Sequence, residues 1–131
     1  MAVTIVKRIL SGSTDAQGLG VSTTAGGTHN TVHTGASATS IIDEVYIYAN
    51  NGYSQTVELV LEWGVSTTSI HRVYQIPPRD ADVLVVAGQI LTGSATNPTV
   101  KAYVGMNGSG SLAASSGFLS LYGWVNRITQ T

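Results

Sequence analysis

The sequence predicts an all-β fold, a single antiparallel β-sandwich of about eight strands over residues 1–131. Short runs rich in β-branched and aromatic residues recur along the whole chain, and turn-forming residues separate them at intervals of about ten residues. No segment keeps the 3.6-residue hydrophobic period of an amphipathic helix. A chain of 131 residues suits one domain, and neither a repeat nor a linker divides it.

The clearest strand signal lies in the first half of the chain. In Ile41–Ala49, apolar residues alternate with Tyr46 and Tyr48 on the opposite face. A turn signal, Asn50–Tyr53, separates this segment from Thr56–Gly64, and we expect the two segments to pair as an antiparallel hairpin. Further strands are expected at Val3–Leu10, Val21–Thr24 and Thr28–Thr34.

The second half of the chain continues this pattern. Ile70–Ile76 alternates and ends at Pro77, because two consecutive prolines remove backbone donors. The continuous apolar run Val83–Val86 predicts a strand that is buried on both faces and broken at Gly88. The remaining expected segments are a short extension at Gln89–Leu91 and strands at Thr99–Val104 and Phe118–Ile128.

The glycine-rich segment Val104–Trp124, VGMNGSGSLAASSGFLSLYGW, raises the question of a phosphate-binding loop. A Walker loop needs a lysine directly after its last glycine, and no lysine follows here. The dinucleotide fingerprint G-x-G-x-x-G is missing too, because Gly105, Gly108 and Gly110 give a different order and a strand follows them. We interpret the segment as a turn between strands, with at most one helical turn at Ser111–Ser116.

Charge is scarce in this chain. Charged residues make up 10% of it, against about 25% in a typical soluble domain, and the net charge is −1. Serine and threonine supply 30 of the 131 residues, and a surface of hydroxyls defends poorly against association. The six Lys and Arg residues are scattered, no cysteine is present, and no apolar run reaches signal-peptide or membrane-span length. We therefore expect a soluble subunit of a larger assembly, with neither nucleic acid nor membrane as partner.

The histidines do not predict a metal site. His29 and His33 are four residues apart, which on a strand separates them by roughly 13 Å at about 3.3 Å per residue, too far for one metal ion. We expect them to face solvent or to pack across strands. His71 is expected on the polar face of its strand, and it could act as a base only beside a nucleophile.

The carboxylates are also expected to be structural. Glu58 and Glu62 share one strand face and mark its solvated side, and Asp80 and Asp82 mark a polar turn. Serines are frequent, but the nucleophile-elbow pattern G-x-S-x-G is absent. The sequence thus predicts a protein that is not an enzyme, with no catalytic, metal-binding or cofactor-binding residues.

Aromatic residues form the most suggestive surface pattern. Tyr46 and Tyr48 share the polar face of one strand, and Tyr122 and Trp124 fall in the last strand. These side chains combine apolar area with a polar group and are enriched at interface centres. Two interpretations stay open: they pack in a second layer of the sandwich core, or they form an exposed interface.

Several phrases in one order resemble small virion proteins of tailed bacteriophages that decorate the capsid. These are LSGSTDAQGLGV, IIDEVYIYANN, VELVLEWG, YQIPPRDADVLVVAGQIL and LYGWVNRI, which together span Leu10–Ile128. The resemblance implies a jelly-roll-like sandwich on the outer surface of the virion head, made in the host cytoplasm. Such capsid decoration (cement) proteins clamp subunits of the major capsid protein, commonly as homotrimers.

The first ten residues, 1–10, are expected to form either an N-terminal arm or an edge strand, with Val3 and Ile5 as further interface candidates. One alternative function is a phage tail or adsorption component. Another is a carbohydrate-binding sandwich that would use exposed Trp63, Trp124 or tyrosines as stacking platforms. A small β-barrel enzyme would require His71 to meet an acid and a serine in one pocket.

Overall fold

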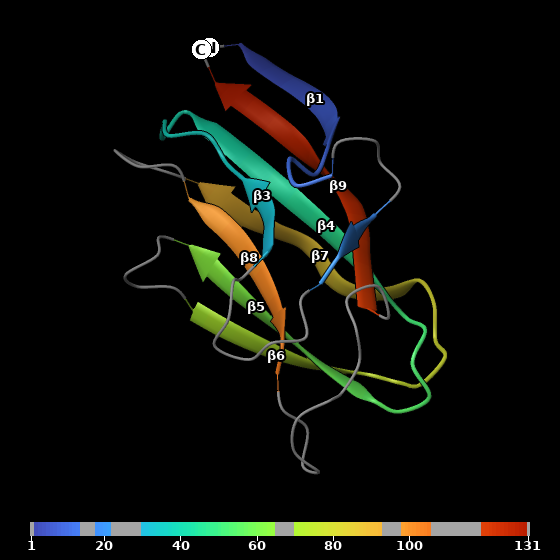
Figure 1. The fold of residues 1–131 in the computed structure, drawn as a ribbon. Coiled ribbons are helices and arrows are strands. Elements are labelled where there is room, and N and C mark those ends of the chain that lie inside the picture. The colour runs from blue at the N-terminus through green and yellow to red at the C-terminus, as the bar shows by residue number, and fades with distance from the viewer. Residues whose placement is uncertain are drawn as a thin grey trace.

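The computed structural model confirms the all-β prediction, because two antiparallel sheets pack together and the described residues contain no helix (Figure 1). It describes residues 2–13, 18–21, 30–64, 70–92, 98–105 and 119–130. Nine strands lie in these ranges, against the eight or so expected. They are β1 (Val3–Ile9), β2 (Leu19–Gly20), β3 (Asn30–Thr34), β4 (Ile41–Asn51), β5 (Val57–Gly64), β6 (Ile70–Ile76), β7 (Val83–Thr92), β8 (Thr99–Val104) and β9 (Leu119–Gln130).

The strand order mixes distant parts of the chain. The five-stranded sheet runs β1-β9-β4-β7, with β2 pairing with β9 as well, and the four-stranded sheet runs β3-β8-β5-β6. From β3 onward only β5 and β6 are consecutive strands that pair with each other. Every other connection between consecutive strands in that range passes from one sheet to the other.

The predicted hairpin between the segments that form β4 and β5 is wrong. β4 pairs with β7 and β9, whereas β5 pairs with β6 and β8. Each strand buries one mainly apolar face, and the two strands contribute these faces to the core from different sheets instead of lying side by side. Buried Asn51 fixes the corner: its amide donates to the carbonyl oxygens of Gln55, Ile76 and Pro77, and its Oδ1 accepts from the backbone N–H of Tyr53.

The core lies between the inner faces of the two sheets. The alternation predicted for Ile41–Ala49 places Val45, Ile47 and Ala49 fully inside, opposite inward residues of β5 such as Leu59. The largest fully buried side chains are Leu10, Ile47, Leu59, Leu61, Ile76, Leu119 and Leu121, followed by Val21, Val32, Val45, Val57 and Val100. Both sheets contribute to this set, so a single hydrophobic core joins them.

The expectation that Val83–Val86 is buried on both faces is wrong. β7 is an edge strand whose one neighbour among the described strands is β4, and Leu84 is 48% exposed. Gly88 does not end the strand, since its φ of +81° accompanies register shifts in the β4–β7 pairing that let β7 continue to Thr92. The apolar run therefore reflects an apolar outer face, not burial on both sides.

Several expected segments fall partly or wholly outside the described residues. The expected strand Val21–Thr24 has only Val21 described, and β2 instead lies at Leu19–Gly20, within a stretch expected to be a turn. Most of the glycine-rich segment Val104–Trp124 and all of Ser111–Ser116 lie outside the described ranges, as does His29.

β1 occupies the end of the five-stranded sheet beside β9 (Figure 1). Of the two expectations for residues 1–10, the structure has the edge strand, since Val3–Ile9 pairs in continuous register with β9. All seven of its residues are exposed. The inward-facing positions of β1 are thus not covered by the four-stranded sheet.

Candidate functional site

The four predicted aromatic residues meet on one surface, the outward face of the five-stranded sheet. The register places Tyr46 opposite Trp124 and Tyr48 opposite Tyr122 on the adjacent strands β4 and β9. Directly opposed residues share a face, and this face is the reverse of the one that carries Val45 and the core. The aromatics therefore do not form a second layer of the core.

The four rings form one stack across the two strands. Tyr46 and Trp124 have ring centroids 5.4 Å apart, Tyr48 and Tyr122 are 5.1 Å apart, and Tyr48 lies 5.6 Å from Trp124. The interplanar angles of the first two pairs are 20° and 11°, so these rings are stacked, whereas the Tyr48–Trp124 pair is tilted by 30°. Such pairs contribute about 0.5–1.5 kcal/mol each beyond their buried area, so the cluster is held rigidly.

The hydroxyl groups of two of these tyrosines, Tyr46 and Tyr122, are already bound within the chain. Tyr46 donates to Glu44 Oε1 at 3.0 Å, and the amide of Asn126 donates to the same oxygen at 3.1 Å. Tyr122 donates to Asp82 Oδ1 at 2.8 Å, and this hydrogen bond raises the pKa of Tyr122 to about 12. The rings thus present mainly apolar edges.

Exposed aliphatic side chains flank the aromatic stack on both sides. On β1, Ile5 lies opposite Ile128 and Ile9 lies opposite Trp124, which places both on the outward face. On β7, Leu84 lies opposite Tyr48. The exposed large aliphatics of this face are Val3 (55%), Ile5 (65%), Ile9 (46%), Leu84 (48%) and Ile90 (47%).

We call this surface the outer aromatic face, defined by the outward residues of β1, β9, β4 and β7. All six residues expected at an interface lie on it: Tyr46, Tyr48, Tyr122, Trp124, Val3 and Ile5. Leu84, Ile9 and Ile90 were missed, because their membership depends on strand neighbours that sequence spacing does not give.

The tryptophans are poorly placed to stack on sugars. Trp63 is 7% exposed and belongs to the core, so it does not offer the exposed platform that the carbohydrate-binding alternative requires. Trp124 has the ammonium of Lys7 5.2 Å from its ring centre on the β1 side and the ring of Tyr46 on the β4 side. Both ring faces of Trp124 are therefore covered by residues of the chain itself.

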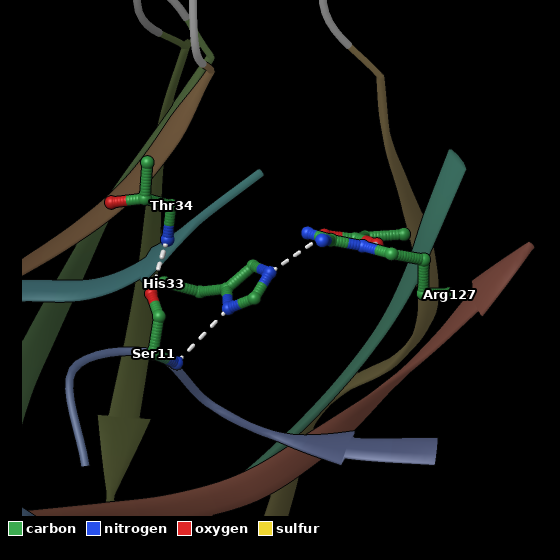
Figure 2. A network of polar contacts seen from close by, with 5 residues as sticks. Ser11, His33, Thr34 and Arg127 are labelled. Carbon is green, nitrogen blue, oxygen red and sulfur yellow. Dashed lines mark hydrogen bonds and ion pairs between the residues drawn. The ribbon is translucent and has the colours of Figure 1, made fainter. Parts of the chain in front are cut away.

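A second feature is a buried polar cluster between the sheets, drawn in Figure 2. His33 from β3 is 2% exposed, and its Nε2 lies 2.8 Å from Asp43 Oδ2 on β4. Arg127 from β9 donates through Nε to Asp43 Oδ1 at 2.8 Å and through Nη2 to Oδ2 at 2.9 Å. Of the two positions expected for His33, facing solvent or packing across strands, the first is wrong, because His33 is buried against Asp43 of another strand.

The hydrogen bonds assign the protonation state of the cluster. The backbone N–H of Ser11 donates to His33 Nδ1 at 3.1 Å, so Nδ1 carries no proton and Nε2 donates to Asp43 (Figure 2). Ser11 Oγ accepts from the backbone N–H of Thr34 at 2.7 Å and does not face the ring nitrogen. A Ser-His-Asp catalytic group needs that nitrogen free to take the serine proton, so these residues do not form one.

Burial and pairing shift both titrating groups of the cluster. Burial is the largest cause that lowers the pKa of His33 below 6.5, and it outweighs the hydrogen bond to Asp43 that raises it. Burial alone would raise the pKa of Asp43, but the hydrogen bonds from Arg127 and His33 hold it below 3.8. At neutral pH the cluster is therefore an ionised carboxylate that accepts hydrogen bonds from a neutral imidazole on one side and from a guanidinium on the other.

These shifts predict that the fold loses stability on acidification. A histidine whose pKa is lower in the folded than in the unfolded chain contributes stability that is present above pH 6.5 and is lost as the pH falls through its folded pKa. Urea denaturation at pH 7.5 and pH 5 should show a lower midpoint at pH 5. His33→Gln, which can still donate to Asp43 and accept from Ser11, should remove most of this difference, whereas His71→Gln should keep it. An equal pH response in the two variants would contradict this assignment.

The other polar residues singled out from the sequence lie apart from this cluster. His71 is exposed on the four-stranded sheet, with its Nε2 3.6 Å from Glu62 Oε2. Asp80 and Asp82 lie in the β6–β7 connection, where Asp82 holds Tyr122. Within the described ranges, no group of three or more His, Cys, Asp or Glu side chains could hold a metal ion. No helix among the described residues is long and apolar enough to cross a membrane.

Comparison of the chain with protein-family models, with characterised proteins and with solved structures found no match. The fold defines the chain as an antiparallel β-sandwich protein. Its distinguishing surface is the outer aromatic face.

Proposed function

We propose that this protein is a non-enzymatic structural component of a tailed-phage virion. In this proposal it binds the outer capsid surface and clamps subunits of the major capsid protein through the outer aromatic face. The observation that carries the docking role is the gathering of five exposed aliphatic side chains around one aromatic stack. Scattered apolar residues are normal on protein surfaces, but a contiguous patch of this kind typically marks an interaction site. The virion itself is proposed from the resemblance of the sequence phrases.

The outer aromatic face is well suited to bind a protein. Tyrosine and tryptophan are the residues most enriched among those that dominate binding energy. Because Tyr46 and Tyr122 are fixed by Glu44 and Asp82, their rings lose little conformational freedom when a partner covers them. Lys7 and Glu44 add a few charges around the apolar centre, as in the polar rim of an interface.

The topology also supports the proposal. A sheet order of β1-β9-β4-β7 against β3-β8-β5-β6 supports the jelly-roll-like arrangement, because most connections between consecutive strands cross from one sheet to the other. Jelly rolls are common in viral capsid proteins and in lectins. Fold alone does not determine function, so the argument for docking rests on the surface residues.

The proposal includes a homotrimer as the favoured assembly. A trimer would match the local three-fold positions at which proteins of the resembled class commonly bind. Light scattering of the purified protein at two concentrations should give three times the chain mass of 13.6 kDa at both. A strict monomer would remove the trimer while leaving the docking surface open to test.

Leu84→Lys tests the docking surface directly. Leu84 is 48% exposed beside Tyr48, so a lysine there should leave the fold intact but bring an unpaired charge into the buried centre of the complex. We expect capsid affinity to fall by at least about tenfold, roughly 1.4 kcal/mol. The assay is co-sedimentation with phage heads that lack their decoration protein.

Val73→Lys is the matched control for this experiment. Val73 is 56% exposed on the outward side of the four-stranded sheet, away from the outer aromatic face. The Val73→Lys variant should bind phage heads with the same affinity as the unmodified protein. Equal binding by the Leu84 and Val73 variants would exclude the outer aromatic face as the contact. Co-sedimentation with purified tails instead of heads would favour a tail or adsorption role.

A further inference from the structure

The free edge of β1 is a second surface that the proposed docking face does not use. β9 is the one strand paired with β1 among the described residues, so the opposite edge of β1 presents backbone N–H and C=O groups without a strand partner. The outward side of the strand is mainly apolar, with Val3, Ile5 and Ile9, and Val6, 50% exposed, adds one apolar side chain to the inward side. An exposed apolar edge of this length is a template for another strand.

Several of the usual protections against strand addition are absent from β1 itself, although one inward-facing charge, Arg8, is present. β1 contains no proline, and its seven-residue register with β9 has no bulge. Lysine commonly blunts an edge, but the ammonium of Lys7 lies over the ring of Trp124 on the outward face. The edge therefore differs from that of a strand protected against pairing.

A pocket of about 600 Å³ lies on the inward side of β1. Residues of β1 and β3 form its walls, and Arg127 of β9 also lines it. The hydroxyl of Ser13, which lines the pocket, is buried and has no hydrogen-bond partner among the described residues. The pocket thus offers a hydrogen-bonding group that is not satisfied within the described chain.

The charge of this pocket is positive. Arg8 faces inward from β1, and its guanidinium makes no hydrogen bond or ion pair with the described residues. The charge of Arg127 is neutralised by Asp43, which accepts hydrogen bonds from both Arg127 and His33. Among the described residues, the guanidinium of Arg8 is thus left without a carboxylate partner.

We propose that β1 accepts an added strand from a partner protein, in which an acidic side chain enters this pocket and pairs with Arg8. Side chains of the added strand alternate between the two faces. Its outward residues would be apolar and extend the row formed by Ile5 and Ile9, and its inward residues would include Asp or Glu. Backbone hydrogen bonds supply affinity in such strand addition, and the side-chain positions supply specificity.

Charge argues against a second copy of this chain as the added strand. β1 carries Lys7 and Arg8 and no acidic residue. Pairing two copies of β1 antiparallel would gather four positive charges along one seam with no carboxylate to neutralise them. Like charges close together across strands are destabilising, so an acidic partner segment is favoured.

Peptide binding to the full chain tests this inference without any capsid. A labelled seven-residue peptide that alternates Glu with Val or Ile should bind in fluorescence anisotropy at least about tenfold more tightly than the same peptide with Lys in place of Glu. Arg8→Gln should weaken binding of the acidic peptide, and Arg8→Glu should make the Lys peptide bind more tightly than the acidic one. Lys101→Gln, a matched loss of charge on β8 of the other sheet, should change neither affinity.

Two further measurements locate the binding. An acidic peptide with N-methylated backbone amides should not bind, because strand addition requires those donors. Hydrogen exchange should show the acidic peptide protecting amides of residues 3–9. The inference is overturned if no peptide binds, if the Arg8 variants bind the acidic peptide as tightly as the unmodified protein does, or if protection appears elsewhere. A homodimer that Arg8→Glu stabilises and that excludes the peptide would also overturn it, in favour of a second copy at this edge.

Discussion

Replacing Asp43 by alanine is expected to lower the free energy of unfolding by about 3–5 kcal/mol, because the change removes one partner from a buried ion pair. Asp43 is 1% exposed and accepts hydrogen bonds from Arg127 at 2.8 and 2.9 Å and from His33 at 2.8 Å. Alanine would leave the guanidinium uncompensated and the imidazole Nε2–H without an acceptor. A buried charge without its partner costs far more than the intact pair contributes.

The neighbouring residue supplies the control for this prediction. Glu44→Ala removes a carboxylate from the same strand, but from its half-buried outward face, where water can replace the lost hydrogen bonds. Urea denaturation followed by circular dichroism should show a loss of about 1 kcal/mol or less for Glu44→Ala. If both variants lost the same small amount, Asp43 would not be the buried anchor that its contacts indicate.

The correct predictions of strand bounds and of side-chain faces rest mostly on local features of the sequence. Ile70–Ile76 and Thr99–Val104 have the predicted bounds, because prolines, glycines and β-branched runs mark strand ends locally. The outward placement of Tyr46 and Tyr48 also follows from a period of two. A side chain's face along a strand is thus a local property that a single sequence can show.

The strand neighbours could not be predicted in this way. Ile41–Ala49 and Thr56–Gly64 follow each other with a turn between them, yet they lie in different sheets. Nothing in their spacing separates a hairpin from a corner, since the difference depends on Asn51 reaching the carbonyls of Ile76 and Pro77. Pairing is decided by contacts across the core that involve distant parts of the chain.

The buried polar cluster could not be predicted from local patterns either, although the position of Asp43 in its strand is one signal of it. His33, Asp43 and Arg127 are brought together by three strands, and Asp43 and Arg127 are 84 residues apart in sequence. Asp43 nevertheless lies two and four residues before Val45 and Ile47, so the alternation of the strand places its carboxylate on the same apolar face. A buried carboxylate requires hydrogen-bond donors, so its position predicts a partner without identifying that partner.

Gly123→Ala is expected to lower the free energy of unfolding by about 3 kcal/mol, because a side chain has no room at this position, where β9 pairs with β4. A Cβ atom at Gly123 would overlap the carbonyl oxygen of Tyr46, which is backbone and cannot rotate away. The strands would have to separate directly beneath the stack of Tyr46 and Trp124. The near-ultraviolet circular dichroism of the aromatic cluster should therefore weaken along with the stability to urea.

Gly64→Ala is the control that distinguishes steric overlap from the backbone strain of a positive φ. Gly64 has φ of +114°, but a Cβ atom there would meet nothing within 4 Å, so alanine should cost only about 1 kcal/mol and leave the aromatic signal unchanged. A larger loss for Gly123, together with the change at the aromatic rings, would show that close approach of β9 to β4 holds the outer aromatic face in shape. Equal losses with an intact aromatic signal would mean that the two strands can move apart without disturbing that face. In that case the rigidity of the face would have to come from its stacked rings and their hydrogen bonds to Glu44 and Asp82 alone.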